Sequence, residues 1–206
     1  MLTRLKQKIQ GMLAAEAIVA HRLGLTPNWI TGIGLVLAFL AALCYAYWAG
    51  DSRILLLATV LLLFSGFCDA LDGVVARIFG EGTVFGGFLD SLLDRYADAV
   101  VYVGIIYGGL CASEYLFWGV GAIIGSLLVS YSRARAEAAG VKMESIGLAE
   151  RAERMLILVG AGLLGFFWQP VTVMTDALVL LAVLTNVTVL QRLIYVYVAT
   201  KKKVVG

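Results

Sequence analysis

The sequence predicts an all-α integral membrane protein, with six transmembrane helices and an amphipathic helix on the membrane surface at its N-terminus. Apolar residues make up 61% of the 206 residues and charged residues only 15%, and the mean hydropathy is +0.93. Soluble domains carry about 25% charged residues. Several apolar runs of about twenty residues are long enough to cross a bilayer as helices. Basic residues gather in every second connection between these runs, as expected for a chain that crosses the membrane repeatedly.

The chain divides into three parts. Residues 1–24 combine apolar residues at helical spacing with Arg4, Lys6 and Lys8, which favours a juxtamembrane helix lying on an anionic membrane surface. A basic leader that only sets the orientation explains the same pattern equally well. Residues 25–200 form one membrane domain and leave no soluble domain of useful size. Residues 201–206 are a basic cytoplasmic tail that begins with a lysine triplet.

Local signals mark the ends of the expected spans. Thr26 is expected to be the N-cap of the first span, with Pro27 at its first helical position. Gln169-Pro170 is expected to stop the fifth span. The six spans are predicted at about residues 30–49, 54–76, 86–111, 115–136, 152–168 and 172–199, connected by a tight turn at 50–53, a short loop at 78–85 and a hydrophilic stretch at 137–150.

The distribution of positive charge sets the orientation. Arginines and lysines precede the first span, follow the second, separate the fourth from the fifth and follow the sixth, whereas the opposite side has Arg53 alone. The positive-inside rule then places both termini in the cytoplasm of a multi-pass cell-membrane protein. The acidic ends of spans two and three and the arginine-rich ends of spans four and five therefore meet at one depth, on the cytoplasmic side.

Four aspartates in or beside apolar runs are the residues around which the chain is organised. Asp69 and Asp72 are spaced i,i+3, and Asp90 and Asp94 are spaced i,i+4, so each pair shares one face of a helix. Carboxylates are costly in such surroundings, and they would repel one another. Two divalent ions bridged by these carboxylates would remove the repulsion, in the arrangement that phosphoryl transfer uses.

The ligand types favour Mg2+ or Mn2+ over zinc. All-oxygen ligation suits these hard cations, and no Cys/His set accompanies the aspartates. The three cysteines are scattered in or next to apolar runs, so they predict neither a disulfide framework nor a CxxC site.

Glycines have two expected roles. Gly73 directly follows Asp72 and removes a side chain where a ligand can approach the backbone. The pairs Gly104/Gly108 and Gly121/Gly125 are expected to serve close helix packing instead.

The arginines suggest an anionic second substrate, although orientation by the positive-inside rule also accounts for several of them. Arg151 and Arg154 are spaced i,i+3 and share a helix face, whereas residues at i,i+2, such as Arg133 and Arg135, point apart on a regular helix. Arg133 has an alternative partner in Glu137 at i,i+4. Arg192 lies inside the last span, and we expect it to serve the cavity rather than snorkel.

These residues also carry a family resemblance. The segment Asp69-Ala-Leu-Asp72-Gly73-Val-Val-Ala76-Arg77 is followed, after eight residues, by Gly86-Gly-Phe-Leu-Asp90-Ser-Leu-Leu-Asp94. The pattern resembles the signature of the CDP-alcohol phosphotransferases at all eight fixed positions, and the resemblance covers nearly the whole chain. It implies transfer of a phosphatidyl-type group from a CDP-linked lipid to an alcohol, with release of CMP.

The resemblance also implies roles for individual residues. Asp69, Asp72 and Asp90 would bind metal, and Asp94 would bind metal and act as the base on the incoming hydroxyl. Two Mg2+ or Mn2+ ions would occupy each active site. The residues expected along the CDP moiety are Gly73, Ala76 and Arg77.

Two further segments, 130–137 and 146–154, resemble the branch of the family that uses inositol phosphate, which includes the phosphatidylinositol-phosphate synthases of actinobacteria and the archaetidylinositol-phosphate synthases of archaea. This likeness implies that the acceptor's phosphate is held by Arg133, Arg135, Arg154 and Arg192. It further implies CDP-diacylglycerol or CDP-archaeol as the donor, membrane lipids as surroundings and a homodimer as the assembly. No nucleic-acid partner is expected.

Other interpretations stay open at the level of sequence. The same chemistry accepts glycerol phosphate, serine or free inositol in place of inositol phosphate. A divalent-cation transporter would also use intramembrane carboxylates, but these cluster at one membrane face instead of spanning the bilayer. A non-catalytic helical scaffold leaves the spacing of the aspartates without explanation.

Overall fold

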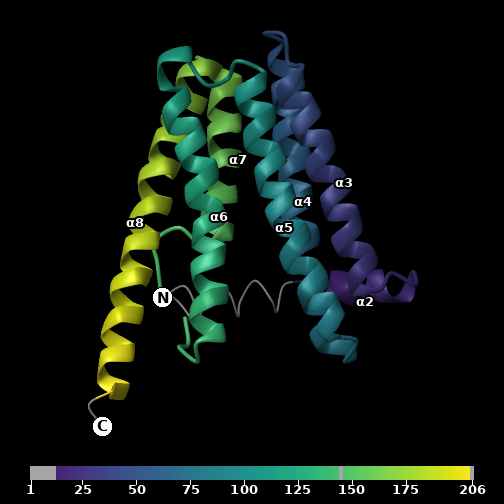
Figure 1. Ribbon diagram of the computed structural model, residues 1–206. Helices are drawn as coiled ribbons and strands as arrows, with labels where there is room; N and C mark the ends of the chain where they lie inside the picture. Colours follow the sequence, from purple (N-terminus) through teal and green to yellow (C-terminus); the bar gives the residue numbers. More distant parts are fainter. Residues whose placement is uncertain (1–12, 144–145, 205–206) are drawn as a thin grey trace.

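The computed structural model describes residues 13–143 and 146–204, and all regular structure in these ranges is helical (Figure 1). The elements are α2 (Ala14–Arg22), α3 (Pro27–Ala46), α4 (Ser52–Phe79), α5 (Val84–Tyr107), the 3-10 turn η1 (Ser113–Tyr115), α6 (Leu116–Ala138), α7 (Arg151–Phe167) and α8 (Pro170–Val204). The predicted all-α class is confirmed for the described residues. Arg4, Lys6 and Lys8 of the expected surface helix lie outside them.

The helix ends follow from local chemistry. Thr26 caps α3 as predicted, accepting a hydrogen bond from the backbone N–H of Trp29, and Pro27 occupies the first helical position. Thr83 caps α5 in the same way through the N–H of Gly86, at 2.9 Å. Helix α4 ends at Gly80, which has a left-handed φ of 67° that suits glycine. Because α4 continues to Phe79, the expected loop at 78–85 shortens to residues 80–83.

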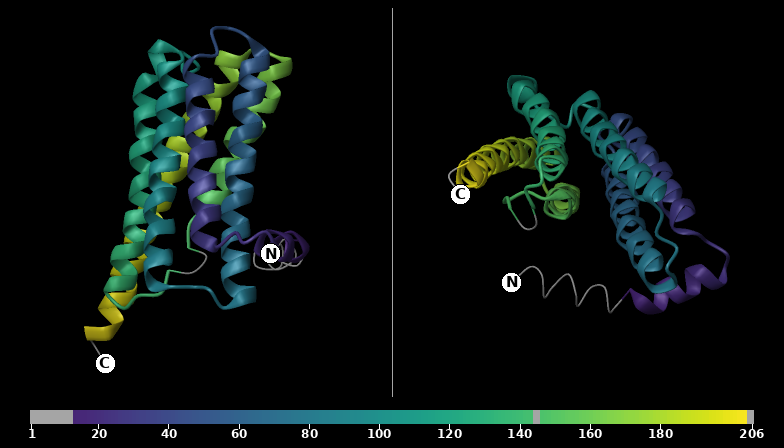
Figure 2. Two further views of the ribbon diagram at one scale, coloured as in Figure 1. Left: turned by 90° about the vertical axis from the view of Figure 1, so that its right-hand side faces the viewer. Right: turned by 60° about the horizontal axis from the view of Figure 1, so that its bottom comes forward.

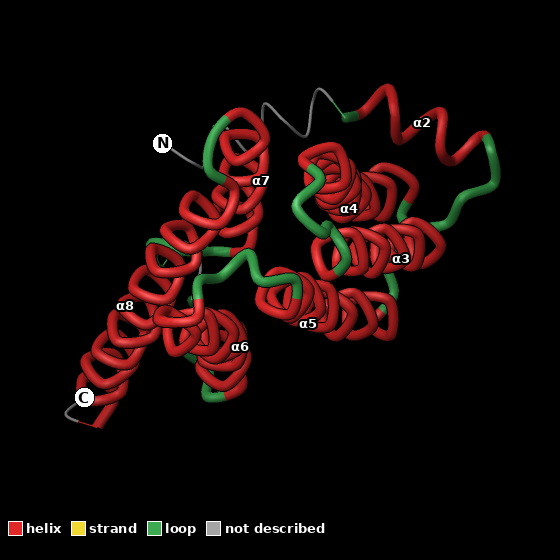
Figure 3. Tube along the Cα trace, turned by 90° about the horizontal axis from the view of Figure 1, so that it is seen from above, coloured by secondary structure: helices red, strands yellow, loops and turns green. Residues whose placement is uncertain are grey.

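The long helices form two groups of three. Helices α3, α4 and α5 make up one group and α6, α7 and α8 the other, as the view from above shows (Figure 3). Contacts between α4 and α7 and between α5 and α6 join the two groups. In the turned views the long helices run side by side along a common direction, with α2 lying across one end (Figure 2). This end also holds the 80–83 loop and the C-terminal end of α6.

Helix α2 is fastened to the end of α4. Ala17 packs in an apolar cluster with Leu71. The ring of His21 stacks on Phe79 with ring centroids 3.7 Å apart, and its Nε2 lies 3.0 Å from a carboxylate oxygen of Glu81. These contacts hold α2 across the end of the bundle.

The chain is a multi-pass membrane protein. Within the described residues, four segments are long and apolar enough to cross a bilayer: Pro27–Ala46, Ser52–Phe79, Ser113–Ala138 and Pro170–Lys201. Helix α5 carries Asp90, Asp94 and Asp98, and α7 has only 17 residues, so neither belongs to this set of four.

Glycines let the helices within each group approach closely. A Cβ at Gly104 or Gly108 of α5 would overlap the backbone of Ala42 or Tyr45 in α3, and a Cβ at Gly125 of α6 would overlap the side chain of Thr185 in α8. The predicted packing role is confirmed for these three glycines, since small residues bring membrane helices into backbone contact. A Cβ at Gly121 would make only an ordinary contact with Ala182, at 3.7 Å.

We expect Gly104→Ala to lower the free energy of unfolding by about 1–3 kcal/mol, because the new methyl group must displace the backbone of α3. The midpoint of thermal unfolding in detergent measures the effect. Gly160→Ala in α7 is the matched control, since its added Cβ would meet no atom within 4 Å beyond the local backbone of its own helix, and it should leave the midpoint unchanged or raise it. Equal midpoints for the two variants would contradict the packing role of Gly104.

Candidate metal centre and active site

Three of the four predicted aspartates converge. Asp69 of α4 and Asp90 and Asp94 of α5 each place one carboxylate oxygen within 4.8 Å of the others. The short 80–83 loop reverses the chain between the two helices, and α3 packs against both of them. The i,i+4 spacing points Asp90 and Asp94 from one face of α5 towards α4. The spacing predicted that all four aspartates come together; the structure brings together Asp69, Asp90 and Asp94, and their binding of metal stays a prediction.

The fourth aspartate, Asp72, lines a small cavity together with Asp69 and Asp94. Its side chain is 6% exposed and accepts a 2.6 Å hydrogen bond from the hydroxyl of Thr31 in α3. Thr31 is a contact that sequence reasoning missed, because nothing in the local pattern distinguishes it from other small polar residues in a membrane helix.

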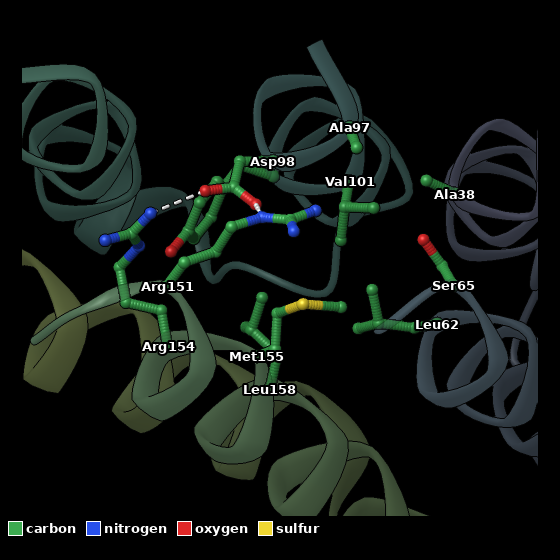
Figure 4. A pocket seen from close by; sticks show the side chains of 11 residues that line it. Ala38, Leu62, Ser65, Ala97, Asp98, Val101, Arg151, Arg154, Met155 and Leu158 are labelled. Atoms are coloured by element: carbon green, nitrogen blue, oxygen red, sulfur yellow. Dashed lines mark hydrogen bonds and ion pairs between the residues drawn. The ribbon is translucent and has the colours of Figure 1, made fainter. Parts of the chain in front are cut away.

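Arg151, the first residue of α7, lies among these carboxylates. Its Nη1 is 2.9 Å from Asp94 and also pairs with Asp69, while its Nε is 3.3 Å from Asp98. Asp98 also forms an ion pair with Arg154, whose Nη2 lies 2.6 Å from Oδ2 of Asp98. The carboxylate of Asp98 therefore lies between two guanidinium groups (Figure 4). The expected shared face of Arg151 and Arg154 is thereby confirmed. Sequence reasoning gave no role to Asp98, although its i,i+4 spacing from Asp94 was a usable signal.

Two of the arginines expected to hold phosphate are buried and brace the backbone. Arg154 is 2% exposed and donates to the carbonyl of Ala149 at 3.0 Å. Arg192 is also 2% exposed; it donates to the carbonyl of Ile146 at 2.8 Å and to the carbonyl of Val129. Arg192 therefore points into the protein instead of snorkelling, and it ties α8 to the C-terminal half of α6 and to the segment before α7. Its expected service to the cavity stays a prediction.

The other two arginines lie on the surface near the end of α6. Arg133 pairs with Glu137 at 2.9 Å, which confirms the alternative partner suggested by the i,i+4 spacing. Arg135 is exposed. Three of the four predicted phosphate-binding arginines, Arg133, Arg154 and Arg192, lie near enough for their charges to interact.

The segment expected along the CDP moiety is the last part of α4. Arg77 is exposed and Ala76 is half-buried. A Cβ added at Gly73 would meet only the guanidinium of Arg77, at 3.8 Å. The backbone at Gly73 is consequently open to an approaching group, beside the aspartates of the same helix.

The donor set fits a hard divalent cation. Asp69, Asp90 and Asp94 offer only oxygen ligands, which Mg2+ and Mn2+ prefer. The Oδ1 atom of Asp90 is buried and has no hydrogen-bond partner among the described residues. A buried carboxylate oxygen without a partner is costly, and a bound cation would supply the missing interaction.

Comparison with known families identifies this arrangement of carboxylates. The family model of the CDP-alcohol phosphatidyltransferases matches residues 24–199. The chain belongs to this family. It is therefore a transferase of phospholipid biosynthesis, and the expected resemblance is confirmed.

The CDP-alcohol phosphatidyltransferases most similar to the chain include enzymes from archaea and actinobacteria. The archaetidylinositol phosphate synthase of Methanothermobacter thermautotrophicus is 42% identical over 179 residues, which cover 87% of each chain. The enzyme of the same name from Pyrococcus horikoshii is 38% identical over the full length of both chains. The phosphatidylinositol phosphate synthase of Mycolicibacterium smegmatis is 38% identical over 85% of this chain and 79% of its own.

Solved structures of the family have the same fold. The phosphatidylinositol phosphate synthase of Mycobacterium tuberculosis in complex with manganese and citrate superposes with a TM-score of 0.78 at 30% identity, covering 90% of this chain and 88% of that chain. The same enzyme with CDP-DAG bound gives a TM-score of 0.77 at 30% identity, covering 90% and 93%. The manganese in the first of these structures agrees with the cation type that the three aspartates favour.

We expect Thr31→Val to destabilise the protein by about 1–3 kcal/mol, because the buried carboxylate of Asp72 loses its hydroxyl donor while the side-chain shape is kept. Thermal unfolding in detergent measures the loss. Thr31→Ser retains the hydroxyl and should lose much less stability. If valine and serine at this position give the same midpoint, the hydrogen bond to Asp72 is not what stabilises this end of α4.

Proposed function

We propose that this CDP-alcohol phosphatidyltransferase transfers the phosphatidyl-type group of a CDP-lipid to a hydroxyl of inositol phosphate and releases CMP. The observation that carries the proposal is the convergence of Asp69, Asp90 and Asp94 at the end of the bundle where the arginine-bearing ends of α6 and α7 also lie. The names of the relatives, archaetidylinositol phosphate synthase and phosphatidylinositol phosphate synthase, support inositol phosphate as the acceptor.

In the proposed mechanism Asp69, Asp72, Asp90 and Asp94 hold two Mg2+ or Mn2+ ions. When bound, these cations neutralise the diphosphate of the donor and the charge that develops on the departing CMP. Gly73 and Ala76 lie along the CDP moiety, where the open backbone of Gly73 lets the diphosphate approach the helix.

Side chains of the protein itself carry out the proton transfer and contact the donor. Asp94 takes the proton of the acceptor hydroxyl as its oxygen attacks the lipid-linked phosphorus. The bond from this phosphorus to the bridging oxygen breaks, and CMP leaves with the electron pair. Arg77, exposed at the end of α4, is available to the phosphates of the donor.

The acceptor would be held through its own phosphate by Arg133, Arg135, Arg154 and Arg192. Arg135 is exposed and so accessible from the aqueous side. Arg154 and Arg192 act partly through the backbone, because they fix the carbonyls of Ala149 and Ile146 in the segment before α7. Glycerol phosphate, serine and free inositol are the competing acceptors, and an acceptor panel against one CDP-lipid decides among them by CMP release.

We further propose six transmembrane spans with both termini and the active site in the cytoplasm. Helix α5, with 24 residues, is about 36 Å long, and α7, with 17, about 26 Å, which is close to the thickness of the hydrocarbon core. The end of the bundle with the aspartates carries Arg22, Lys142 and the arginines of α6, whereas Arg53 lies at the opposite end.

Two parts of the proposed assembly lie beyond the membrane bundle. Residues 1–24 would form the amphipathic surface helix, of which α2 is the described part. The homodimer is supported by family membership alone.

A divalent-cation transporter, as the alternative function, has no support in the comparisons. Such a transporter would carry metal ions across the membrane of proteoliposomes without releasing CMP.

Asp94→Asn should lower CMP release by about 10^2–10^4-fold, because the amide cannot accept the proton of the acceptor hydroxyl. The assay contains CDP-lipid, inositol phosphate and Mg2+ with purified protein in detergent. Asp51→Asn removes a carboxylate at the other end of α4, where asparagine still caps the helix, and should keep its activity. Wild-type rates in Asp94→Asn would remove Asp94 as the base.

Arg135→Ala should raise the KM for inositol phosphate by about 10-fold or more, because a charge-assisted hydrogen bond to the acceptor's phosphate is removed. The KM for the CDP-lipid should stay unchanged. Arg53→Ala, at the opposite end of the bundle, is the control for the loss of one positive charge. An unchanged KM for inositol phosphate in Arg135→Ala would show that this guanidinium does not bind the phosphate.

A further inference from the structure

Arg151 occupies a position that a bound cation also needs. Its Nη1 pairs with Asp69 and lies 2.9 Å from Oδ1 of Asp94, and these are two of the three carboxylates grouped as cation ligands. The side chains of Arg151 and Asp94 are only 18% and 17% exposed. Water therefore does little to screen the charges that meet there.

We propose that Arg151 is a movable positioning residue, which competes with the divalent cation for Asp69 and Asp94 and shifts to Asp98 when the cation binds. This inference rests on the proposed function, because it takes Asp69 and Asp94 as metal ligands.

Arg151 and the cation exclude each other for two reasons. Nη1 of Arg151 forms ion pairs, without a hydrogen bond of good geometry, in the space beside the carboxylate oxygens that a cation would contact. The guanidinium and the cation also carry like charges, and their repulsion within a few ångströms is strong in a site with little water. Cation binding at Asp69 and Asp94 therefore requires the outer guanidinium nitrogens of Arg151 to withdraw.

Asp98 offers the place to which they withdraw. The Nε atom of Arg151 already lies 3.3 Å from Oδ1 of Asp98, so only the outer end of the side chain has to turn. Asp98 is itself held in place, because Arg154 lies 2.6 Å and the hydroxyl of Ser126 lies 3.3 Å from its other oxygen, Oδ2. Asp98 therefore acts as a fixed anchor for the moving guanidinium.

A small cavity also lies beside Asp98. Arg151 lines two neighbouring cavities, one with Asp69 and Asp94 and the other with Asp98 and Tyr102. Figure 4 shows the second, with the side chain of Arg151 extending past Asp98 between α5 and α7.

The second cavity is also lined by a hydrogen-bond acceptor, the hydroxyl oxygen of Tyr102. The hydroxyl of Tyr102 is buried and forms no hydrogen bond of good geometry with the described residues, although Ser126 and Arg154 are neighbours. Tyr102 and Arg151 line the same cavity, so this oxygen is an acceptor in the space towards which the guanidinium would turn.

The test is the affinity for Mn2+, measured from the electron paramagnetic resonance signal of the free ion during titration of purified protein in detergent. Arg151→Lys keeps the positive charge but has a single nitrogen in place of the separate Nε and Nη1 that reach Asp98 and Asp94, so it competes less well. We expect Arg151→Lys to lower the Kd for Mn2+ several-fold and Arg151→Gln to lower it by about tenfold or more. Arg53→Gln, a charge change at the far end of the bundle, should leave the Kd unchanged.

Each other outcome overturns the inference. If only Arg151→Gln binds Mn2+ more tightly, the effect is one of net charge and Arg151 is not displaced. If both variants bind Mn2+ as the wild type does, or more weakly, Arg151 and the cation do not compete. Because Arg151→Lys keeps the charge that the aspartates need, the comparison survives even if Arg151→Gln does not fold. A wild type that binds no Mn2+ would instead overturn the metal centre of the proposed function, and this inference with it.

Discussion

The repulsion among five aspartate side chains at one end of an apolar helix bundle is the constraint on which the rest of the structure depends. Asp69, Asp72, Asp90, Asp94 and Asp98 are all half-buried or buried, in surroundings that screen charge poorly. Each of these carboxylates lies close to an arginine side chain, to a hydroxyl donor or to another carboxylate. The fold must therefore bring cationic groups to the same depth, and it does so from a helix distant in the sequence.

Helix packing provides the precision that this charge balance needs. Gly104 and Gly108 bring α5 into backbone contact with α3, and α3 in turn packs against α4. The carboxylates of α4 and α5 are consequently held within reach of one another by an apolar framework. The same framework lets Thr31 of α3 reach Asp72, so a helix without any acidic residue takes part in the centre.

The cationic side of the centre is built by helix ends. Arg151 and Arg154 project from the first turn of α7, and the preceding segment is held through the carbonyls of Ala149 and Ile146 by Arg154 and Arg192. These buried arginines thus serve the shape of the site as well as its charge. Burying so many charged side chains in a membrane protein is energetically costly. Membership of the CDP-alcohol phosphatidyltransferases explains this cost, since a diphosphate donor and a phosphorylated acceptor both need cations nearby.

The sequence alone determined what is periodic or local. Hydropathy predicted the helices, Thr26 and Pro27 marked the start of α3, and helical spacing placed Asp90 beside Asp94 and Arg151 beside Arg154, because a residue's position on a helix depends only on its neighbours in the chain. Only the tertiary structure decided that Arg151 lies on Asp69 and Asp94 and that Asp98 joins the two arginines of α7. Such contacts depend on the relative rotation and depth of separate helices, which packing determines and local spacing does not.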